Sequence, residues 1–411
     1  MIQFIHTADI HFGMENYGKI DAATGIHSRL LDFERALNVV IDTAIERNVD
    51  FFLFSGDAYK TATPTPTQQK LLMRCFFRLY AHNIPIVIIV GNHDHPMSFG
   101  KATALDVFSN VPVDGFHVVT KPEIIHLTTK NGPINIVGIP WPTRHNITLK
   151  EEHINSTSQE ITEYISQGIG SIIQQLAAEL DPTVPAVLAG HLTVSTGIFS
   201  GSEKRAIYGT DPVVLPSQLA IAPFDYVALG HLHRYQNLNP QGYPAVVYAG
   251  SIERIDFGER NDTKGFCVVS IPSKGNATHE FITTPMRPFI QLEVTVDQHE
   301  EPTTKILQEL ARYSLQGAII KIIYHLAANA QDKLDLKAIQ LACKDAMYIV
   351  SITPIRAAQQ RPARGTIPVT NDLQTLMRNY LTYKKLAPED IERIVNKTLA
   401  LQQLLLDEEL R

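Results

Sequence analysis

The sequence predicts an α/β fold built from more than one domain. Over the first 250 residues, continuous apolar runs alternate with segments whose apolar residues recur at helical spacing, an order typical of layered α/β proteins. The runs are apolar at nearly every position, which indicates strands covered on both faces. The chain has 411 residues, and single cores stop growing at roughly 250–300 residues, so we expect at least two domains.

The expected strands and helices of the first domain follow one another along the chain. Apolar residues at helical spacing between Leu30 and Ile45, and from Thr67 to Ala81, predict two helices. Four of the predicted strands end in glycine followed by a polar residue, and glycine permits the tight turn that brings such a side chain back over the strand end. The predicted strands are Ile2–Ile5, Phe51–Phe54, Ile86–Val90, Ile134–Ile139, Ala186–Ala189, Tyr226–Leu229 and Val246–Tyr248.

Two prolines within four residues, Pro285 and Pro288, interrupt the alternation of strands and helices, and we expect the first domain, residues 1–285, to end there. Residues 286–357 predict a compact α+β cap with the order strand, helix, strand, helix, strand. Residues 358–370 are rich in Gln, Arg, Pro and Gly and predict a linker. Residues 371–411 carry two apolar stripes, typical of helices that either pack on their own domain or dock on a partner helix. The expected cap elements are strands at Phe289–Val296, Ala318–Tyr324 and Tyr348–Ile355 and helices at Thr303–Tyr313 and Leu334–Ala346.

Composition is that of an ordinary globular enzyme, with 44% hydrophobic and 19% charged residues. No stretch approaches the roughly 20 apolar residues of a membrane span, and the N-terminal residues lack the pattern of a signal peptide, so we expect a cytoplasmic protein without a membrane partner. Three cysteines without metal-type pairing fit a reducing compartment. The net charge of −6 argues weakly against nucleic acid, but two divalent cations would change that balance locally.

Seven potential metal ligands stand at the ends of the predicted strands. Asp9 and His11 lie two residues apart, as do His231 and His233, so each pair can point to one side of an extended backbone. Carboxylate and imidazole together suit Mn²⁺, Fe²⁺ or Zn²⁺ better than Ca²⁺. A single residue of this kind is usually a polar turn residue, but seven in this order predict two adjoining metal sites, with Asp57 able to bridge them. The seven are Asp9, His11, Asp57, Asn92, His191, His231 and His233.

The motifs around these ligands resemble those of the calcineurin-like metallophosphoesterases. They are Ile5-His6-Thr7-Ala8-Asp9-Ile10-His11-Phe12-Gly13, Phe54-Ser55-Gly56-Asp57, Val90-Gly91-Asn92-His93-Asp94, Gly190-His191 and Ala228-Leu229-Gly230-His231-Leu232-His233. Within that superfamily, the opening motif and residues 248–259 are similar to the SbcD nucleases. The match is strong over about residues 1–260, whereas the cap and terminal helices are similar mainly in order and length.

The resemblance implies a four-layer α/β/β/α sandwich with two Mn²⁺ ions at the strand ends. One ion would be held by Asp9, His11, Asp57 and His233, and the other by Asp57, Asn92, His191 and His231. The position of His93 implies contact with the scissile phosphate and assistance to the leaving oxygen, with Asp94 placed to orient its ring by a hydrogen bond.

Lys60 departs from a pattern of many archaeal and eukaryotic relatives, which carry a histidine three residues after the bridging aspartate. The lysine can bind a phosphate as a point charge but cannot act as an imidazole acid. The alternative interpretation is that Lys60 is a solvated loop residue without a role in the reaction. A mechanism that requires a histidine at this position is therefore in doubt for this chain.

The resemblance also implies a DNA nuclease, a 3′–5′ exonuclease on double strands and an endonuclease on single strands or hairpins, acting in DNA repair, recombination and replication. The chain has no Walker A pattern, so ATP dependence would come from an SbcC-type ATPase that receives the C-terminal helices. A homodimer within a heterotetramer is implied, with Thr67–Ala81 or Phe99–Phe108 as the dimer contact, and with it association with the nucleoid. Candidate DNA phosphate contacts are His27, Arg29, Arg144, His145, Lys204, Arg205, Arg254 and Arg260.

Two other classes of function remain open. A phosphatase or small-nucleotide phosphodiesterase could use the same two-metal centre, but it needs neither cap nor terminal helices. A non-catalytic scaffold that binds DNA ends or a partner would not need the full ligand set or His93.

Overall fold

A computed structural model of the protein describes residues 1–95, 102–110, 113–143, 157–201, 211–297, 299–327, 330–357 and 372–409. The chain divides into two compact units. The first comprises Met1–His325 and Asp332–Pro354, and the second comprises Leu326–Gln331 and Ile355–Arg411. The linker expected at residues 358–370 lies outside the described residues.

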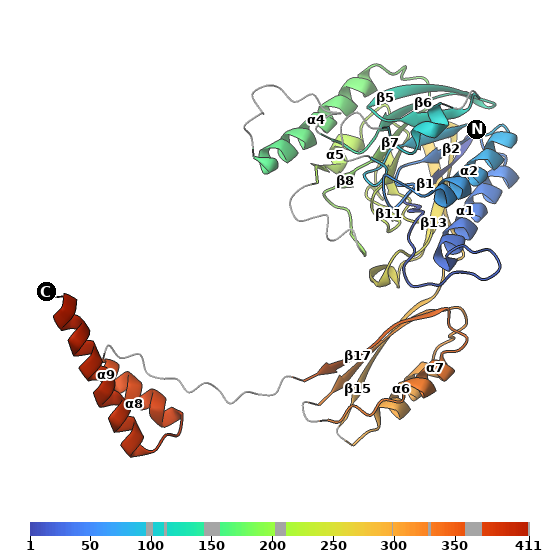
Figure 1. Cartoon of the computed structure of the whole chain (residues 1–411). Coiled ribbons are helices and arrows are strands. Elements are labelled where there is room, and N and C mark those ends of the chain that lie inside the picture. The colour runs from blue at the N-terminus through green and yellow to red at the C-terminus, as the bar shows by residue number, and fades with distance from the viewer. Residues whose placement is uncertain are drawn as a thin grey trace. The chain divides into compact units, whose positions relative to one another are not determined.

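The first unit contains a six-stranded sheet around the first strand of the chain (Figure 1). In order across the sheet, its strands are β14 (Asn276–Thr283), β13 (Gly265–Ser273), β1 (Ile2–Thr7), β2 (Phe51–Phe54), β3 (Ile86–Ile89) and β4 (Phe116–Val119). The strands β1 to β4 run parallel, whereas β13 is antiparallel to β1. The carboxyl ends of β1, β2 and β3 therefore lie at one edge of this sheet.

A second six-stranded sheet packs against the first. Its strands, in order, are β11 (Gln236–Asn237), β12 (Ala245–Tyr248), β10 (Tyr226–Gly230), β7 (Ala186–His191), β6 (Gly132–Ile139) and β5 (Glu123–Thr129). The central strands β12, β10, β7 and β6 are parallel, and the two edge strands are antiparallel to their neighbours. The loops after β7 and β10 thus leave this sheet at the same edge.

Helices cover the outer faces of the two sheets, which gives the four layers α/β/β/α. The helices α1 (Ser28–Glu46) and α2 (Pro66–Ala81) pack on the first sheet, and α4 (Ser158–Ala178) and α5 (Pro216–Leu219) pack on the second (Figure 1). Alternate residues of β2 face opposite layers, because Phe52 and Phe54 meet the helices while Phe51 and Leu53 meet the other sheet. The continuous apolar sequences of the strands are explained by this burial on both faces.

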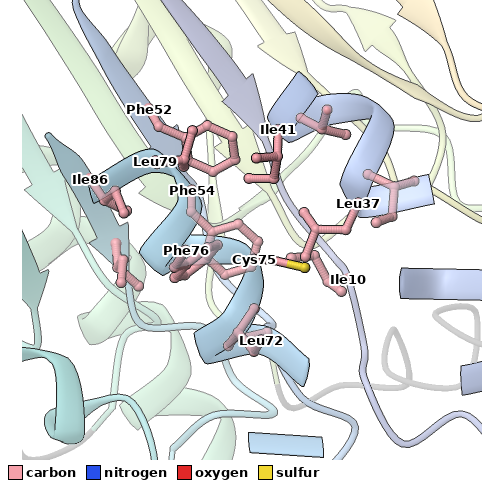
Figure 2. Packing of buried hydrophobic residues seen from close by; sticks show 14 of the residues in the cluster. Ile10, Leu37, Ile41, Phe52, Phe54, Leu72, Cys75, Phe76, Leu79 and Ile86 are labelled. Carbon is pink, nitrogen blue, oxygen red and sulfur yellow. The ribbon is translucent and has the colours of Figure 1, made fainter. Parts of the chain in front are cut away.

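Figure 2 shows the packing of α1 and α2 on the first sheet. Phe76 of α2 lies with its ring centroid 5.9 Å from that of Phe52 and 6.1 Å from that of Phe54. The helix begins at Pro66 because the Thr65 side chain and Gln68 form a capping box that satisfies the first free amides. This layer fixes the strands whose ends carry the predicted ligands.

Several elements of the first unit have no counterpart among the sequence predictions, among them β4, β5, β13, β14 and α4. The helix α4 has a sequence signal, since Thr157 and Glu160 form a capping box and Ile161, Ile165 and Ile169 recur every four residues. The sequence signal for β14 is weaker, because this strand lies at the edge of the sheet and its residues alternate between exposed and half-buried.

A three-stranded sheet follows the two prolines. Its strands lie in the order β15 (Phe289–Val296), β16 (Ile319–Leu326) and β17 (Tyr348–Arg356), accompanied by α6 (Pro302–Leu310) and α7 (Leu336–Ala342). The order of elements is the predicted one, although α7 is shorter than the expected helix. Arg287, just before β15, forms an ion pair with Asp32 of α1 and donates through its backbone N–H to Glu253, 3.0 Å away.

The second unit contains the two C-terminal helices, α8 (Leu373–Tyr383) and α9 (Pro388–Glu409). Arg378 of α8 and Glu392 of α9 form a two-pronged ion pair, with both nitrogen–oxygen distances at 2.8 Å. Apolar side chains remain exposed on both helices: Leu373, Tyr380, Leu401 and Leu405. None of the helices in the described ranges is long and apolar enough to cross a bilayer.

Candidate metal centre

The seven predicted ligands come from the carboxyl ends of strands in both sheets. Asp9 and His11 follow β1, Asp57 follows β2 and Asn92 follows β3, so the first sheet supplies four of them. The second sheet supplies the other three, His191 at the end of β7 and His231 and His233 after β10. Six of the seven are buried and Asn92 is half-buried. The structure therefore gathers the entire predicted set where the edges of the two sheets meet.

Four of these ligands have backbone conformations that L-residues seldom adopt. The φ angles are 54° at Asp9, 50° at His11, 60° at Asp57 and 101° at His231. Residues held in such regions cost on the order of 1–3 kcal/mol each and cluster at functional sites. Hydrogen bonds between the loops hold this backbone, with the Asp9 N–H donating to the Gly56 carbonyl and the His11 N–H donating to the Asp57 carbonyl.

The glycines before the ligands act in two different ways. We expected each to permit an unusual turn, and of the four only Gly56 has a positive φ, +101°. At Gly230 the need is for space, because a Cβ there would lie 2.1 Å from the Ser55 carbonyl oxygen. The prediction that every one of these glycines permits an unusual turn is thus wrong. At Gly230 glycine is required because the loops approach too closely for a side chain. The four are Gly56, Gly91, Gly190 and Gly230.

The first group of ligands surrounds the Nε2 atom of His11. This atom lies 3.0 Å from His233 Nε2 and 3.6 Å from Asp57 Oδ2. Asp9, His11 and His233 each offer a ligand atom within 4.8 Å of the others. Two imidazole nitrogens that point at one another beside carboxylate oxygens form the mixed oxygen and nitrogen shell that suits a divalent transition metal.

The second group surrounds His191 and shares Asp57 with the first. His191 Nε2 lies 2.9 Å from Asn92 Oδ1 and 3.4 Å from Asp57 Oδ2. His231 Nδ1 lies 3.1 Å from the same Asn92 oxygen, and its buried Nε2 has no hydrogen-bond partner among the described residues. The Asp57 carboxylate thus lies beside both groups, as a bridging ligand would. Asp9 also offers an oxygen within 4.8 Å of ligand atoms of Asp57 and His191.

The protonation of the centre fits the binding of cations. Burial holds the pKa values of His11 and His231 well below the ordinary value, so both rings are neutral and keep a lone pair for a metal. Burial acts to raise the pKa of Asp57, but His191 and His11 hold it well below its ordinary value. Burial would lower the pKa of His191, whereas Asp57 beside it raises that pKa to about 9. In the metal-free protein the negative charge of Asp57 thus favours a proton on His191, and a bound cation can replace the positive charge of that proton.

The ring of His93 lies next to the first group, and its Nδ1 is 2.8 Å from the backbone carbonyl of Lys60. We expected Asp94 to orient this ring, and that expectation is wrong. The fully buried Asp94 carboxylate instead accepts backbone N–H groups of Asp57, Tyr59 and Gly91, at 2.9, 3.1 and 3.1 Å. It therefore fixes the loop that carries Asp57.

The same contact gives the Lys60 position a role that does not depend on its side chain. Because a backbone carbonyl accepts from His93 Nδ1, any residue at position 60 could supply this hydrogen bond. The proton is then on Nδ1, which leaves Nε2 as the atom that can meet a substrate. The sequence could not reveal this, since it rests on the path of the backbone.

Several candidate DNA contacts are occupied within the protein. Arg29 is fully buried and its Nη1 lies 3.0 Å from Asp32, so it cannot reach a DNA phosphate. Arg254 donates to the backbone carbonyls of Arg287 and Asp262, and Arg260 donates to that of Phe257. His27 accepts the Arg29 N–H at the start of α1. Four further candidates, Arg144, His145, Lys204 and Arg205, lie outside the described residues.

Some residues near the centre were not assigned from the sequence. Glu259 lies 2.8 Å from His233 Nδ1 and is fully buried. The Trp141 ring lies 4.8 Å from that of His231, centroid to centroid. Asp211 Oδ2 lies 3.9 Å from His231 Nε2. Glu259 belongs to a motif that carries the resemblance, but the motif alone does not indicate which ligand it contacts.

Comparisons with known proteins agree with this geometry. The sequence matches the family model of the calcineurin-like phosphoesterases over residues 2–235, a range that holds all seven predicted ligands. The chain is 28% identical over 312 residues to the D subunit of the nuclease SbcCD of Staphylococcus epidermidis, and the match covers 75% of this chain and 75% of that protein.

Two solved structures are also similar. One is a dimetal phosphatase from Danio rerio, with a TM-score of 0.39 and 9% identity over 69% of this chain and 99% of that one. The other is the protein TT1561 of Thermus thermophilus, with a TM-score of 0.36 and 13% identity over 68% of this chain and 98% of that one. The family model spans more than half of the chain, and on that match this protein belongs to the calcineurin-like phosphoesterases and is a metal-dependent phosphoesterase.

Proposed function

We propose that the protein is a two-metal DNA nuclease that uses Mn²⁺, a 3′–5′ exonuclease on double-stranded ends and an endonuclease on single strands and hairpins. The observation that carries the proposal is the pair of ligand groups joined by Asp57. The similarity to a subunit of the nuclease SbcCD over 75% of both chains supports DNA as the substrate. In this proposal the protein acts in DNA end processing, repair, recombination and replication.

The ligand groups indicate which residues would hold the two cations. Asp9, His11, Asp57 and His233 would hold one, and Asp57, Asn92, His191 and His231 the other. When bound there, two divalent cations would supply positive charge to hold a phosphodiester, activate a water and stabilise the leaving oxygen.

In this proposal His93 acts on the substrate. Its Nδ1 is fixed on the Lys60 carbonyl, and burial lowers the pKa of the free imidazole. A phosphodiester bound beside the ring brings negative charge that favours the protonated form, so that Nε2 can donate a proton toward the leaving oxygen.

The C-terminal helices support the proposal that an SbcC-type ATPase is the partner. Their exposed side chains, Leu373, Tyr380, Leu401 and Leu405, form part of the second unit, which contains none of the seven ligands. Apolar side chains on a helical surface suit a partner helix. In this proposal the protein works as a homodimer within a heterotetramer.

The proposal is tested with purified protein, MnCl₂ and a linear duplex labelled at one end, with para-nitrophenyl phosphate as a second substrate. The wild-type protein should shorten the duplex, and Asp57→Asn should not, since it removes the carboxylate shared by both ligand groups. Omitting MnCl₂ is the matched control for metal dependence. Hydrolysis of the small ester without shortening of DNA would instead identify a phosphatase.

A further inference from the structure

The metal ligand His233 is held from behind by a buried carboxylate. Its Nδ1 lies 2.8 Å from Glu259 Oε1, and Glu259 lies in the short 3₁₀-helix η3 (Phe257–Glu259) with none of its surface exposed. With its proton on Nδ1, the ring presents Nε2, the atom that faces His11, to a cation. Glu259 is thus placed to choose both the tautomer and the orientation of His233.

A buried lysine completes this arrangement. Lys264 Nζ lies 2.9 Å from Glu259 Oε2 and donates to the backbone carbonyl of His233, 2.8 Å away. The backbone N–H of Ile255 donates to the same Glu259 oxygen, at 2.9 Å. Burial acts to raise the pKa of Glu259, but Lys264 and His233 bring it down to about 2. The two members of this ion pair therefore hold His233 at two points: Glu259 bonds to its ring, and Lys264 bonds to its backbone carbonyl.

An ion pair of this kind is a poor way to stabilise a fold. Removing two charges from water costs several kcal/mol per ion, and apolar replacements of buried pairs are often neutral or stabilising. A carboxylate behind a metal-binding histidine has a recognised effect, because it fixes the ring and makes it a stronger ligand. The contacts of Glu259 and Lys264 thus fit a role in metal binding better than a role in stability.

A second buried glutamate on the same segment provides a comparison. Glu253 is 1% exposed, and its carboxylate lies 3.9 Å from Arg29 and accepts the backbone N–H of Arg287. These contacts hold the start of the cap and touch none of the seven ligands. The two glutamates therefore share burial and location but differ in whether they reach the metal centre.

We propose that Glu259, together with Lys264, is a positioning residue for His233 and sets the affinity of one metal position, the one that includes Asp9 and His11. This inference rests on the proposed two-metal centre. It predicts an asymmetric effect: loss of the Glu259 carboxylate weakens the position that uses His233 and leaves the one around His191 and Asn92 unchanged.

The test is titration of the full-length, metal-free protein with MnCl₂ by calorimetry, alongside thermal unfolding of the metal-free protein. Single replacement of Glu259 would remove the carboxylate 2.9 Å from buried Lys264 and leave only the more distant Asp262, at 4.0 Å. The variants are therefore the double changes Glu259→Gln/Lys264→Met and Glu259→Leu/Lys264→Met. We expect one of the two Mn²⁺ affinities to fall by about 10- to 100-fold. The Gln variant, which keeps an oxygen acceptor for Nδ1, should lose less than the Leu variant. His233→Ala identifies which affinity belongs to this position.

Glu253→Gln is the matched control, because it neutralises the neighbouring buried glutamate. It should lower the unfolding temperature and leave both Mn²⁺ affinities unchanged. The inference is overturned if both double variants bind two Mn²⁺ ions as wild type does, if they weaken both positions equally, or if Glu253→Gln weakens Mn²⁺ binding as much. A wild-type protein that takes up no Mn²⁺ would instead refute the proposed function.

Discussion

At the scale of single residues, His6 joins the two sheets beneath the metal centre. Its Nδ1 lies 3.1 Å from the Tyr226 hydroxyl and its Nε2 lies 3.2 Å from the Leu229 carbonyl, so β1 is bonded to β10. These strands lead to Asp9 and His11 on one side and to His231 and His233 on the other. Burial lowers the pKa of His6 to about 3, because the charged ring is excluded from the core.

This shift makes a prediction about acid stability. A histidine whose folded pKa is about 3 and whose unfolded pKa is 6.5 binds more protons when unfolded between these values. Its contribution, on the order of a few kcal/mol, is fully present above pH 6.5 and is lost as the pH falls toward 3. The free energy of unfolding in urea should therefore fall less steeply over this range for His6→Gln than for wild type. Equal slopes would show that His6 does not titrate on unfolding.

Asp94 and His93 are adjacent, and the structure predicts opposite consequences for their replacement. Asp94→Asn turns an amide N–H₂ toward backbone donors, so it should lower the free energy of unfolding by about 2–4 kcal/mol and weaken Mn²⁺ binding through the Asp57 loop. His93→Gln should leave stability and Mn²⁺ binding near wild type and lower the rate of DNA cleavage by about 10²–10⁴-fold. Urea unfolding, calorimetry and cleavage of the labelled duplex separate the two. If Asp94→Asn were as stable as wild type, its assigned role would be wrong.

At the scale of elements, the loop after β2 depends on the absence of a side chain at Gly56. A Cβ there would lie 2.3 Å from Nδ1 of the predicted ligand His191, and the φ of +101° at Gly56 is also unfavourable for other residues. Gly115 has nearly the same φ, +103°, with no neighbour of its Cβ within 4 Å among the described residues. The two glycines thus separate backbone strain from the clash with the ligand.

We predict that Gly56→Ala destabilises the protein more than Gly115→Ala and weakens Mn²⁺ binding, which Gly115→Ala should leave intact. Strain at a positive φ is common to both and amounts to roughly 1 kcal/mol, so the excess at position 56 reports the displacement of His191. Urea unfolding and MnCl₂ calorimetry measure both quantities. Equal effects of the two substitutions would show that the close contact at Gly56 relaxes without moving the ligand.

The strands and their loops show which parts of the fold and of the candidate site can be predicted from the sequence. Strands buried on both faces are readable as continuous apolar runs, and the polar residues after such runs mark candidate ligands. The seven candidates could therefore be picked out from the order of residues alone, and the structure brings them together. The sequence does not say which strands are neighbours, so the meeting of Asp9 with the backbone of His231 across two sheets could not be derived. The partner of His93 was also out of reach, since a carbonyl can be supplied by any residue.

At the scale of the whole molecule, the metal centre exists because two sheets place their strand ends at the same edge. The second unit contributes none of the seven ligands. We predict that removing residues 371–411 leaves the Mn²⁺-dependent shortening of a duplex near the wild-type rate and abolishes co-purification with an SbcC-type ATPase. A truncated chain that still co-purifies would place the docking surface outside residues 371–411.

The most direct test of the two-metal centre is anomalous diffraction from crystals soaked in MnCl₂. The geometry predicts two peaks on either side of the Asp57 carboxylate, one beside His11 and His233 and one beside His191 and Asn92. Both peaks should disappear or weaken in Asp57→Asn. A single peak, or peaks that avoid Asp57, would contradict the account.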